Sequence, residues 1–462
     1  MASLTATAYS QVQGLNPAGT PNPDYERLVD VENLIDYMIC TFYMGDLDAP
    51  ISSFLQNSRP NNFYAVYNRT NPDGFKFFRH DGEHTMFNVN ENRTGPYSAG
   101  QQSQYFNPQW LHQQLAAHPE YKMRFADRVY KHFFNDGVMT PEAAAGLLTA
   151  RKDAIDLAII AESARWGDAK VTKPRTRDND WLPQVRYLLD EYFPKRTDIV
   201  LGQFRAKGWY PNVEAPSFNQ HGGVADSGFI LAMAAPAGEI YYTVDGSDPR
   251  LPGGAIHAGA IAYVGPLVLT ESTRIRARTL QGVAWSAVHD ATFAVGSVAE
   301  GLRISEIMYC PMDAVDPGAE YVELTNIVDE TIHLNLVRFT DGIDFVFPRF
   351  QLAPGACCLV VGDIAAFEAK YGPGLPVAGE YAGRLANGGE TIELVDAMGT
   401  VIHCFAYRDD WYDTTDGRGF SLTRVDVTDP DLEAWSRKEA WQASSVVDGS
   451  PGTADPGVLP LP

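Results

Sequence analysis

The side chains most suited to chemistry form an acidic run in the first hundred residues. Gly45-Asp46-Leu47-Asp48 follows an apolar segment, Asn62 opens an aromatic segment, and a second aromatic segment ends in His80-Asp81-Gly82-Glu83. Mg²⁺ prefers oxygen ligands and usually takes only one or two carboxylates from a protein. If these residues meet at one point, the sequence predicts a site for Mg²⁺ and phosphate. The alternative is a solvated acidic loop, because Asp and Asn are also common in turns.

A helix is expected to position the first part of this run, Gly45 to Asp48. Apolar side chains recur three and four positions apart from Leu28 to Phe42 and predict a helix that starts at Pro23 or Asp24. Gly45 is expected to be its C-cap, so the acidic motif leaves the partly negative end of the helix, which favours a bound cation. Residues 1–23 are rich in small and turn-forming side chains and predict an irregular lead-in.

A β-hairpin must deliver the second part. The aromatic segments 62–67 and 74–78 flank Asn71-Pro72-Asp73-Gly74, which is a strong turn signal. Antiparallel partners place the start of the first strand beside the end of the second. The hairpin is therefore expected to bring Asn62 near Asp81.

Residues 107–209 show helical periodicity in several pieces. One piece starts at Pro141 in the first helical position after Thr140. Further along lies Glu162-Ser163-Ala164-Arg165-Trp166-Gly167-Asp168. An i,i+3 pair of Glu162 with Arg165 and a packed Trp166 give this segment a structural explanation, and the alternative is a substrate-binding role.

The composition changes near Tyr210-Pro211, where alternating β-branched segments with Gly and Pro turns replace the helices. This pattern predicts β-sandwiches. Within residues 213–297, a strand enters the tight turn Asp245-Gly246-Ser247-Asp248-Pro249, and we interpret both aspartates as turn formers rather than metal ligands. Alternation from residue 300 to 452 predicts a second sandwich, and residues 453–462 are expected to be disordered.

The acidic run resembles the C-terminal lobe of the CotH family of atypical, secreted protein kinases. That family typically carries Asn-x-Asp after a helix, an Asn before aromatic residues, and an aromatic strand ending in Trp-Asp-x-Asp or Trp-Asp-x-Glu. The corresponding stretches are Asp46-Leu47-Asp48, Asn62-Phe63-Tyr64 and His80-Asp81-Gly82-Glu83. Asp46 stands where Asn is usual, and His80 stands where Trp is usual. The segment from Glu162 to Asp168 is similar to one in CotH-like chains.

The resemblance implies Mg²⁺-dependent phosphoryl transfer from ATP to a protein or small-molecule acceptor. It implies that Asp48 accepts or orients the proton of the acceptor hydroxyl, and that Asn62 and Asp81 hold Mg²⁺. Glu83 would bind a second ion, and Asp46 would either join the metal ligands or add repulsion to the site. No Gly-x-Gly-x-x-Gly or Walker sequence precedes Asp48, and no residue is assigned to nucleotide binding.

Residues 1–212 are therefore expected to be a kinase C-lobe without its nucleotide-covering N-lobe. They would belong to a longer protein or to a reduced descendant that has lost the nucleotide clamp. The first hypothesis for function is accordingly a truncated or degenerate CotH-like kinase. The second is a non-catalytic secreted or cell-surface protein whose sandwiches bind glycan or protein, and it is motivated by the missing clamp and the two altered motif positions.

Two more resemblances concern the β-rich part. Residues 213–297 resemble the C-terminal sandwich domain of chitobiases and hexosaminidases, whose hallmark Tyr-Thr-x-Asp-Gly-Ser-x-Pro appears here as residues 242–249. Residues 300–452 resemble the lamin tail domain, an immunoglobulin-like module of many secreted bacterial proteins. The expected fold is thus a multidomain α+β chain, in which a mainly helical kinase-like lobe with a β-hairpin precedes two immunoglobulin-like β-sandwiches.

The negative net charge of the chain limits the classes of partner that it is expected to bind. The chain has a net charge of -22, and residues 1–212, with 22 basic and 24 acidic side chains, contribute only -2 of it. An acidic surface repels phosphate backbones, which argues against nucleic acid and anionic membranes. No run of about 18 apolar residues predicts a membrane span. A protein substrate or a cell-surface glycan is the expected partner in an extracellular or cell-surface setting, although residues 1–23 lack the pattern of a signal peptide.

The five cysteines are too few and too scattered for a disulfide framework, and no Cys-x-x-Cys pair indicates zinc. We interpret Cys40 as a buried, unreactive thiol. A bridge from Cys404 to Cys357 or Cys358 is left open, because these residues are predicted on neighbouring strands. A transition-metal site involving His80 and His84 is a minor alternative.

Overall fold

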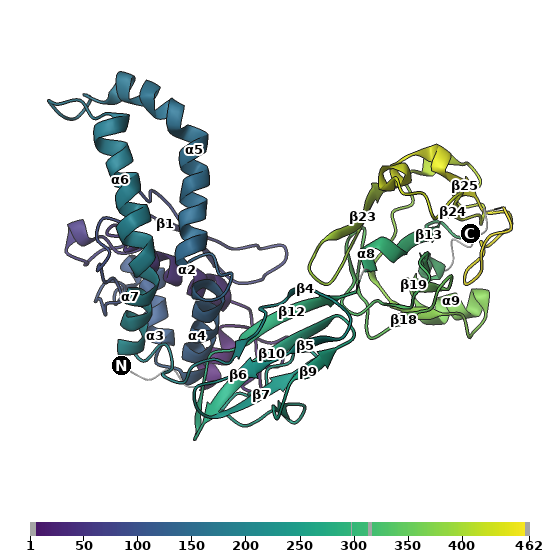
Figure 1. The fold of residues 1–462 in the computed structure, drawn as a ribbon, viewed down its shortest axis with the longest axis horizontal. Helices are drawn as coiled ribbons and strands as arrows, with labels where there is room; N and C mark the ends of the chain where they lie inside the picture. The colour runs from purple at the N-terminus through teal and green to yellow at the C-terminus, as the bar shows by residue number, and fades with distance from the viewer. Residues whose placement is uncertain (1–5, 297, 313–316, 458–462) are drawn as a thin grey trace.

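The computed structural model describes residues 6–296, 298–312 and 317–457. The chain is helical up to Ala206 apart from one hairpin, and strands dominate from Ser217 onward (Figure 1). The α+β class predicted from the sequence is therefore confirmed. No helix in these ranges is both long and apolar enough to cross a membrane.

The helical lobe is built around α2, whose inner face is fully buried at Leu34, Ile35 and Met38. Helix α2 contacts helices α3, α4 and α7 and strand β2. The helix that leads into the acidic motif is therefore packed against neighbours on several sides. The lobe comprises α1 (Ala6–Gln11), α2 (Val31–Met44), β1 (Phe63–Val66), β2 (Lys76–Arg79), α3 (Pro108–Leu115), α4 (Pro119–Phe133), α5 (Pro141–Trp166), α6 (Leu182–Tyr187) and α7 (Phe193–Ala206).

Helix α2 starts later than the sequence predicts. Asp30 is its N-cap and accepts a hydrogen bond from the Asn33 amide, a preferred way to satisfy the first turn. The backbone of Leu28 is engaged elsewhere, since its carbonyl accepts from the Phe75 amide next to the hairpin. The lead-in also contains the short helix α1. The later start of α2 arises because the residues just before Asp30 pair with Phe75, a distant contact that local periodicity does not reveal.

The predicted hairpin is confirmed. Strands β1 and β2 pair antiparallel with Phe63 opposite Arg79 and Val66 opposite Lys76. The ladder extends by one more bond, from the His80 amide to the Asn62 carbonyl at 3.1 Å. Asn62 and Asp81 thus lie at the open end of the hairpin, as expected.

Helices α5 and α6 form an arm that extends away from the lobe (Figure 1). Thr140 caps α5 as predicted, with its hydroxyl accepting from the Ala143 amide. Trp166 at the far end of α5 is 54% exposed, and the Arg165 guanidinium lies 5.0 Å from the centre of its ring. The expectation of a packed Trp166 is wrong, because the arm has no neighbour there in the described part of the chain. Among the described residues, Arg165 contacts the Trp166 ring and forms no ion pair with Glu162.

The first β-rich region has a main sheet with the strand order β4-β12-β10-β7-β8, and β11 pairs with β10. Two smaller pairs, β3 with β6 and β5 with β9, complete a sandwich around Leu231, Ile275 and Phe293. The strands are β3 (Ser217–Phe218), β4 (Gly223–Ala225), β5 (Phe229–Leu231), β6 (Met233–Ala234), β7 (Glu239–Thr243), β8 (Ile261–Ala262), β9 (Leu267–Leu269), β10 (Thr273–Gln281), β11 (Ala284–Trp285) and β12 (His289–Val295).

A buried arginine joins this sandwich to the lobe. Arg278 is 1% exposed and donates to Asp127 on α4, at 2.7 Å from both terminal nitrogens, and to Asp248 in the turn after β7, at 2.7 Å from Nε. The turn role of Asp245 and Asp248 is confirmed, since they accept from the amides of Ser247 and Arg250. The sequence did not indicate that Asp248 also belongs to this ion pair.

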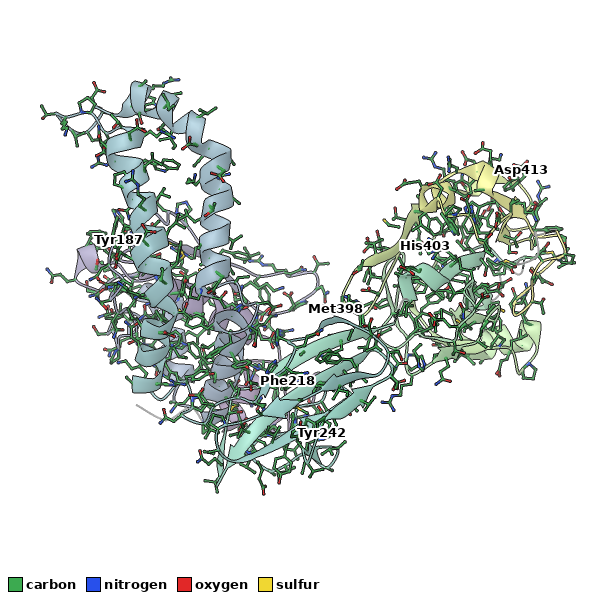
Figure 2. The ribbon with its side chains drawn as sticks, viewed as in Figure 1. Tyr187, Phe218, Tyr242, Met398, His403 and Asp413 are labelled. Atoms are coloured by element: carbon green, nitrogen blue, oxygen red, sulfur yellow. The ribbon has the colours of Figure 1, made fainter. Side chains whose placement is uncertain are left out.

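The second β-rich region contains two larger sheets, with the orders β20-β19-β14-β13-β24-β25 and β21-β17-β16-β22-β23, and the small pair β15-β18. The turn between β22 and β23 carries Met398 and reaches towards the first sandwich (Figure 2). The elements are α8 (Val298–Gly301), β13 (Leu302–Met308), β14 (Tyr321–Asn326), β15 (Ile332–His333), β16 (Arg338–Asp341), β17 (Ile343–Val346), β18 (Gln351–Leu352), β19 (Cys357–Val361), α9 (Ile364–Tyr371), β20 (Val377–Glu380), β21 (Ala382–Gly383), β22 (Thr391–Val395), β23 (Val401–Ala406), β24 (Leu422–Arg424) and β25 (Trp441–Ala443).

All five cysteines are free. The bridge that the sequence left open does not form, because Cys404 is exposed on β23 while Cys357 and Cys358 lie on β19 in the other sheet. Cys40 is half-buried beside Arg79 rather than fully enclosed.

The start of the predicted disordered tail is tied to the second sandwich. Asp455 is 4% exposed and accepts from the Ser445 amide at 2.7 Å. The last five residues of that prediction, 458–462, lie outside the described residues.

Two buried carboxylates lie on neighbouring strands beneath the C-terminal loop of the second sandwich. Glu306 accepts from Tyr321 Oη at 2.6 Å and from the Ser450 amide at 2.9 Å, and Glu323 accepts from the Gly452 amide at 2.9 Å. Burial, and then the neighbouring Glu306 charge, raise the pKa of Glu323 to about 8, and burial also raises the pKa of Glu306. The protonated form is therefore favoured in the folded state.

This pair predicts that the second sandwich loses stability as the pH rises. The unfolded glutamate titrates near pH 4.3, so the stabilising contribution is complete below that pH and is lost as the pH rises through about 8. We expect the free energy of unfolding to fall by on the order of a few kcal/mol between pH 5 and pH 9. Calorimetric unfolding at several pH values measures this fall in the free energy of unfolding.

Glu323→Gln should flatten this pH dependence, whereas Glu368→Gln on the surface of α9 should leave it unchanged. A transition equally stable at pH 5 and pH 9 in the unaltered chain would contradict the assignment.

Candidate functional site

Asp48 lies in a nearly closed pocket after the end of α2. It retains 9% of its surface, so one edge reaches solvent. Its Oδ1 accepts from the Ser52 hydroxyl, and its Oδ2 accepts from the side-chain amides of Asn61, at 3.1 Å, and Asn62, at 3.0 Å. No basic residue in the described ranges pairs with it. Three neutral donors therefore fix its orientation without a cation to neutralise it.

Asn62 links Asp48 to the hairpin and faces outward with its other end. An ionised carboxylate can only accept, so the Asn62 amide nitrogen must face Asp48 and its Oδ1 must point away. No donor in the described part of the chain contacts that oxygen. Asn62 has φ +50°, a left-handed conformation that costs most residues 1–2 kcal/mol but that Asn and Asp tolerate better. The conformation turns the side chain of Asn62 back towards Asp48.

Asp46 is held inside the lobe and is not available to a metal. Its side chain is 1% exposed, and Oδ1 accepts from the amides of Asp48, at 2.9 Å, and Ala49, at 3.0 Å. Its Oδ2 pairs with Arg79 at the end of β2. The predicted metal role of Asp46 thus has no support in this geometry, because both oxygens are already engaged.

Arg79 is the functional neighbour that sequence reasoning missed. It neutralises the buried negative charge of Asp46. The sequence did contain a signal for this pair. A buried acidic residue such as Asp46 is rarely found without a partner, and Arg79 directly precedes the second acidic cluster. Only the hairpin register places that arginine beside Asp46.

Asp81 and Glu83 are exposed at the open end of the hairpin. Asp81 also has a left-handed backbone, with φ +51°, and its carboxylate makes no hydrogen bond or ion pair within the described ranges. Glu83 is 3.3 Å from His84 Nε2, and the Leu47 amide donates to the His84 carbonyl at 3.0 Å. That last bond connects the acidic turn after α2 with the segment after β2.

The structure thus brings Asp48 and Asn62 into direct contact and fixes Asp46 through Arg79. It leaves both Asp81 and Glu83 on the surface, with Glu83 next to His84 and Asp81 without a polar partner among the described residues. Among the described residues, no group of three or more His, Cys, Asp or Glu side chains is arranged to hold a metal. The side-chain oxygens of Asn62 and Asp81 are of the chemical kind that Mg²⁺ prefers, and that ion needs few protein ligands when phosphate oxygens and water supply the others.

A buried arginine holds this corner of the lobe together. Arg196 on α7 is 0% exposed, and burial lowers its pKa. It donates to the carbonyls of Phe42 and Tyr43 in the last turn of α2 and to those of Val89 and Glu91. The last carbonyls of a helix have no partner within the helix, so Arg196 supplies one for α2.

Gly45 must be glycine for two reasons. Its φ of +59° places it in the left-handed region, and a Cβ atom would lie 3.0 Å from Glu91 Cβ and 3.3 Å from Arg196 Nη2. The predicted C-cap is confirmed. The turn that carries Asp46 and Asp48 therefore starts from a fixed point.

We expect Arg196→Lys to destabilise the lobe by about 2–4 kcal/mol, because lysine cannot reach four carbonyls that point in different directions and some would stay buried without a donor. Urea unfolding measures the loss. Lys195→Gln is the matched control on the same helix, since its ion pair with Glu191 is half exposed and its removal should cost less than about 1 kcal/mol. Equal effects of the two variants would show that Arg196 does not hold the end of α2.

Two parts of the chain match known family models. The family model described as CotH kinase protein matches residues 9–199, and the one described as Fn3 associated matches residues 230–293. No curated protein matches the chain. The first match contains all five predicted site residues, while the chitobiase and lamin tail resemblances stay predictions. Over its helical lobe, the chain is therefore similar to CotH kinase proteins.

Proposed function

We propose that the helical lobe transfers a phosphoryl group from ATP to a hydroxyl of a protein or small-molecule acceptor. The observation that supports this proposal best is the contact between Asp48 and Asn62, which leaves one edge of Asp48 open and the Asn62 Oδ1 free. Phosphoryl transfer depends mainly on positioning and charge stabilisation, which such a small set of fixed groups can provide.

In this proposal Asp48 is the residue that touches the acceptor. The acceptor oxygen attacks the γ-phosphorus, the bond from that phosphorus to the bridging oxygen breaks, and ADP leaves with the electron pair. Asp48 orients the acceptor hydroxyl and takes up its proton. Ser52, Asn61 and Asn62 keep the carboxylate in one orientation during this step.

Asn62 and Asp81 would hold Mg²⁺, which supplies charge neutralisation on the phosphate oxygens when bound. Two protein oxygens make a weak site alone, so binding of the ion should depend on nucleotide. Glu83 is available for a second ion but is already next to His84. Asp46 has the different task of holding the turn through two backbone amides and Arg79.

A second candidate function is non-catalytic display of the lobe and sandwiches on a cell surface. The observation that favours it is the exposure of aromatic side chains around the site, with Tyr64 at 48% and Phe87 at 57%. Exposed apolar groups of this size often mark contact surfaces.

We expect Asp48→Asn to lower the rate of phosphate transfer by about 10²–10⁴-fold, because the asparagine cannot take up the proton. Transfer of labelled γ-phosphate to the chain itself or to a generic protein acceptor measures the rate. Asp73→Asn, in the connection of the same hairpin and paired with Lys76 on the surface, is the control and should keep the activity. Absence of both nucleotide binding and phosphate transfer in the unaltered chain would remove the kinase proposal.

Asn62→Ala should raise the Mg²⁺ concentration needed for half-maximal activity by about 10–100-fold, since one metal-facing oxygen is lost. Titration calorimetry with Mg²⁺ alone, ATP alone and both together measures the same dependence without turnover. Tight binding of Mg²⁺ without nucleotide would contradict a site made of two protein oxygens.

A further inference from the structure

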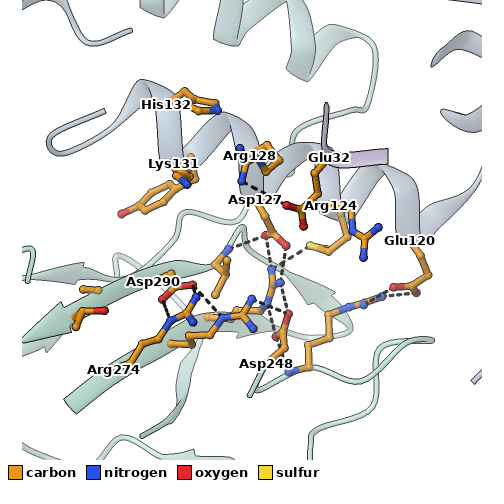
Figure 3. Close-up of a pocket in the computed structure, with 18 of the residues that line it drawn as sticks. Glu32, Glu120, Arg124, Asp127, Arg128, Lys131, His132, Asp248, Arg274 and Asp290 are labelled. Carbon is orange, nitrogen blue, oxygen red and sulfur yellow. Dashed lines mark hydrogen bonds and ion pairs between the residues drawn. The ribbon is translucent and has the colours of Figure 1, made fainter. Parts of the chain in front are cut away.

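A large cleft lies between the lobe and the two sandwiches, with a volume of ≈ 1760 Å³. Helix α4 forms one wall, and strands β10 and β12 of the first sandwich form another (Figure 3). The second sandwich contributes Arg338 and Met398. None of Asp48, Asn62 and Asp81 lines the cleft, so it is separate from the proposed phosphoryl-transfer site.

The carboxylates in this cleft are all paired. Six acidic side chains line it, and each lies within ion-pair distance of an arginine or a histidine. The pairs are Glu32 with Arg128, Glu120 with Arg250, Asp127 with Arg278, Asp136 with His221, Asp248 with Arg278, and Asp290 with Arg274. Five of the six carboxylates therefore have an arginine partner, while Asp136, whose side chain is 84% exposed, faces a histidine that is charged only when protonated.

Three cations in the same cleft have no carboxylate partner among the described residues. Arg124 donates to the Gln13 side-chain oxygen at 2.6 Å, Lys131 is exposed, and Arg338 reaches only the Asp396 carbonyl at 3.4 Å. Arg124 and Lys131 are seven residues apart on α4, which places them on one face about 10 Å from each other. Arg338 comes from β16 in the second sandwich, so the free charges belong to two separate parts of the molecule.

We propose that this cleft binds an acidic peptide segment in an extended conformation. Eight basic and six acidic side chains line it, an excess of positive charge in a chain with a net charge of -22. Its volume exceeds the roughly 300–1,000 Å³ of ordinary small-molecule pockets, which suits a polymer. Charge complementarity of this kind selects partners and speeds their association.

The lining favours a peptide over an acidic polysaccharide. Sugar rings pack their apolar faces on exposed aromatic rings. The tyrosines that line the cleft, Tyr9 and Tyr130, are 6% and 7% exposed. Guanidinium groups recognise single carboxylates by hydrogen bonds, which Asp and Glu side chains on an extended peptide provide. The inference does not depend on whether the lobe transfers phosphate.

Fluorescence anisotropy with a labelled ten-residue Asp/Glu-rich peptide tests the proposal on the full chain. We expect saturable binding that weakens as salt rises, and no binding of the matching Gln/Asn peptide. The double variant Arg124→Gln/Lys131→Gln should weaken peptide binding by about tenfold or more. Arg338→Gln, in the second sandwich, should also weaken peptide binding.

The double variant Lys122→Gln/Arg151→Gln removes the same charge outside the cleft and should bind like the unaltered chain. Circular dichroism confirms that each variant is folded. Failure of the acidic peptide to bind, equal loss in both double variants, or binding of an oligouronate but not of the peptide would each overturn the proposal.

Discussion

The arrangement of the candidate site depends on the hydrogen bonds that the carbonyl groups at the end of α2 accept. A helix leaves its last carbonyls without partners, and here those carbonyls are buried. Arg196 reaches them from α7 and at the same time binds the Val89 and Glu91 carbonyls of a loop. One side chain thus fixes a helix end and a loop relative to each other. The short turn from Gly45 to Asp48 has little freedom left.

Charge inside that turn is balanced locally. Asp46 brings a buried negative charge, and Arg79 from the hairpin meets it, while Asp48 is surrounded by neutral donors only. Two aspartates separated by one residue therefore have different tasks. The first holds the turn in shape, and the second keeps an edge open to solvent. This division rests on which oxygens are already engaged.

The first sandwich is joined to the lobe as part of one structure. Arg278 buries its charge between Asp127 of α4 and Asp248 of the sandwich, and Arg250 adds a second pair with Glu120. Breaking such a buried set would leave unpaired carboxylates in a poorly hydrated place, which is costly. The cleft therefore has walls whose separation is fixed by ion pairs. Of the three remaining cations, Arg124 is held by Gln13, and Lys131 is exposed on the same helix.

The sequence alone determined the local features. Periodicity gave the apolar face of α2, the turn residues gave the hairpin and its register, and Gly45 marked the helix end, because each depends on neighbours within a few residues. It also grouped Asp48 with Asn62 correctly. Tertiary structure decided the rest. The pairing of Asp46 with Arg79, the reach of Arg196, the exposure of Trp166 and the burial of Arg278 between two regions all depend on which distant segments come into contact, and residue spacing along the chain does not encode those contacts.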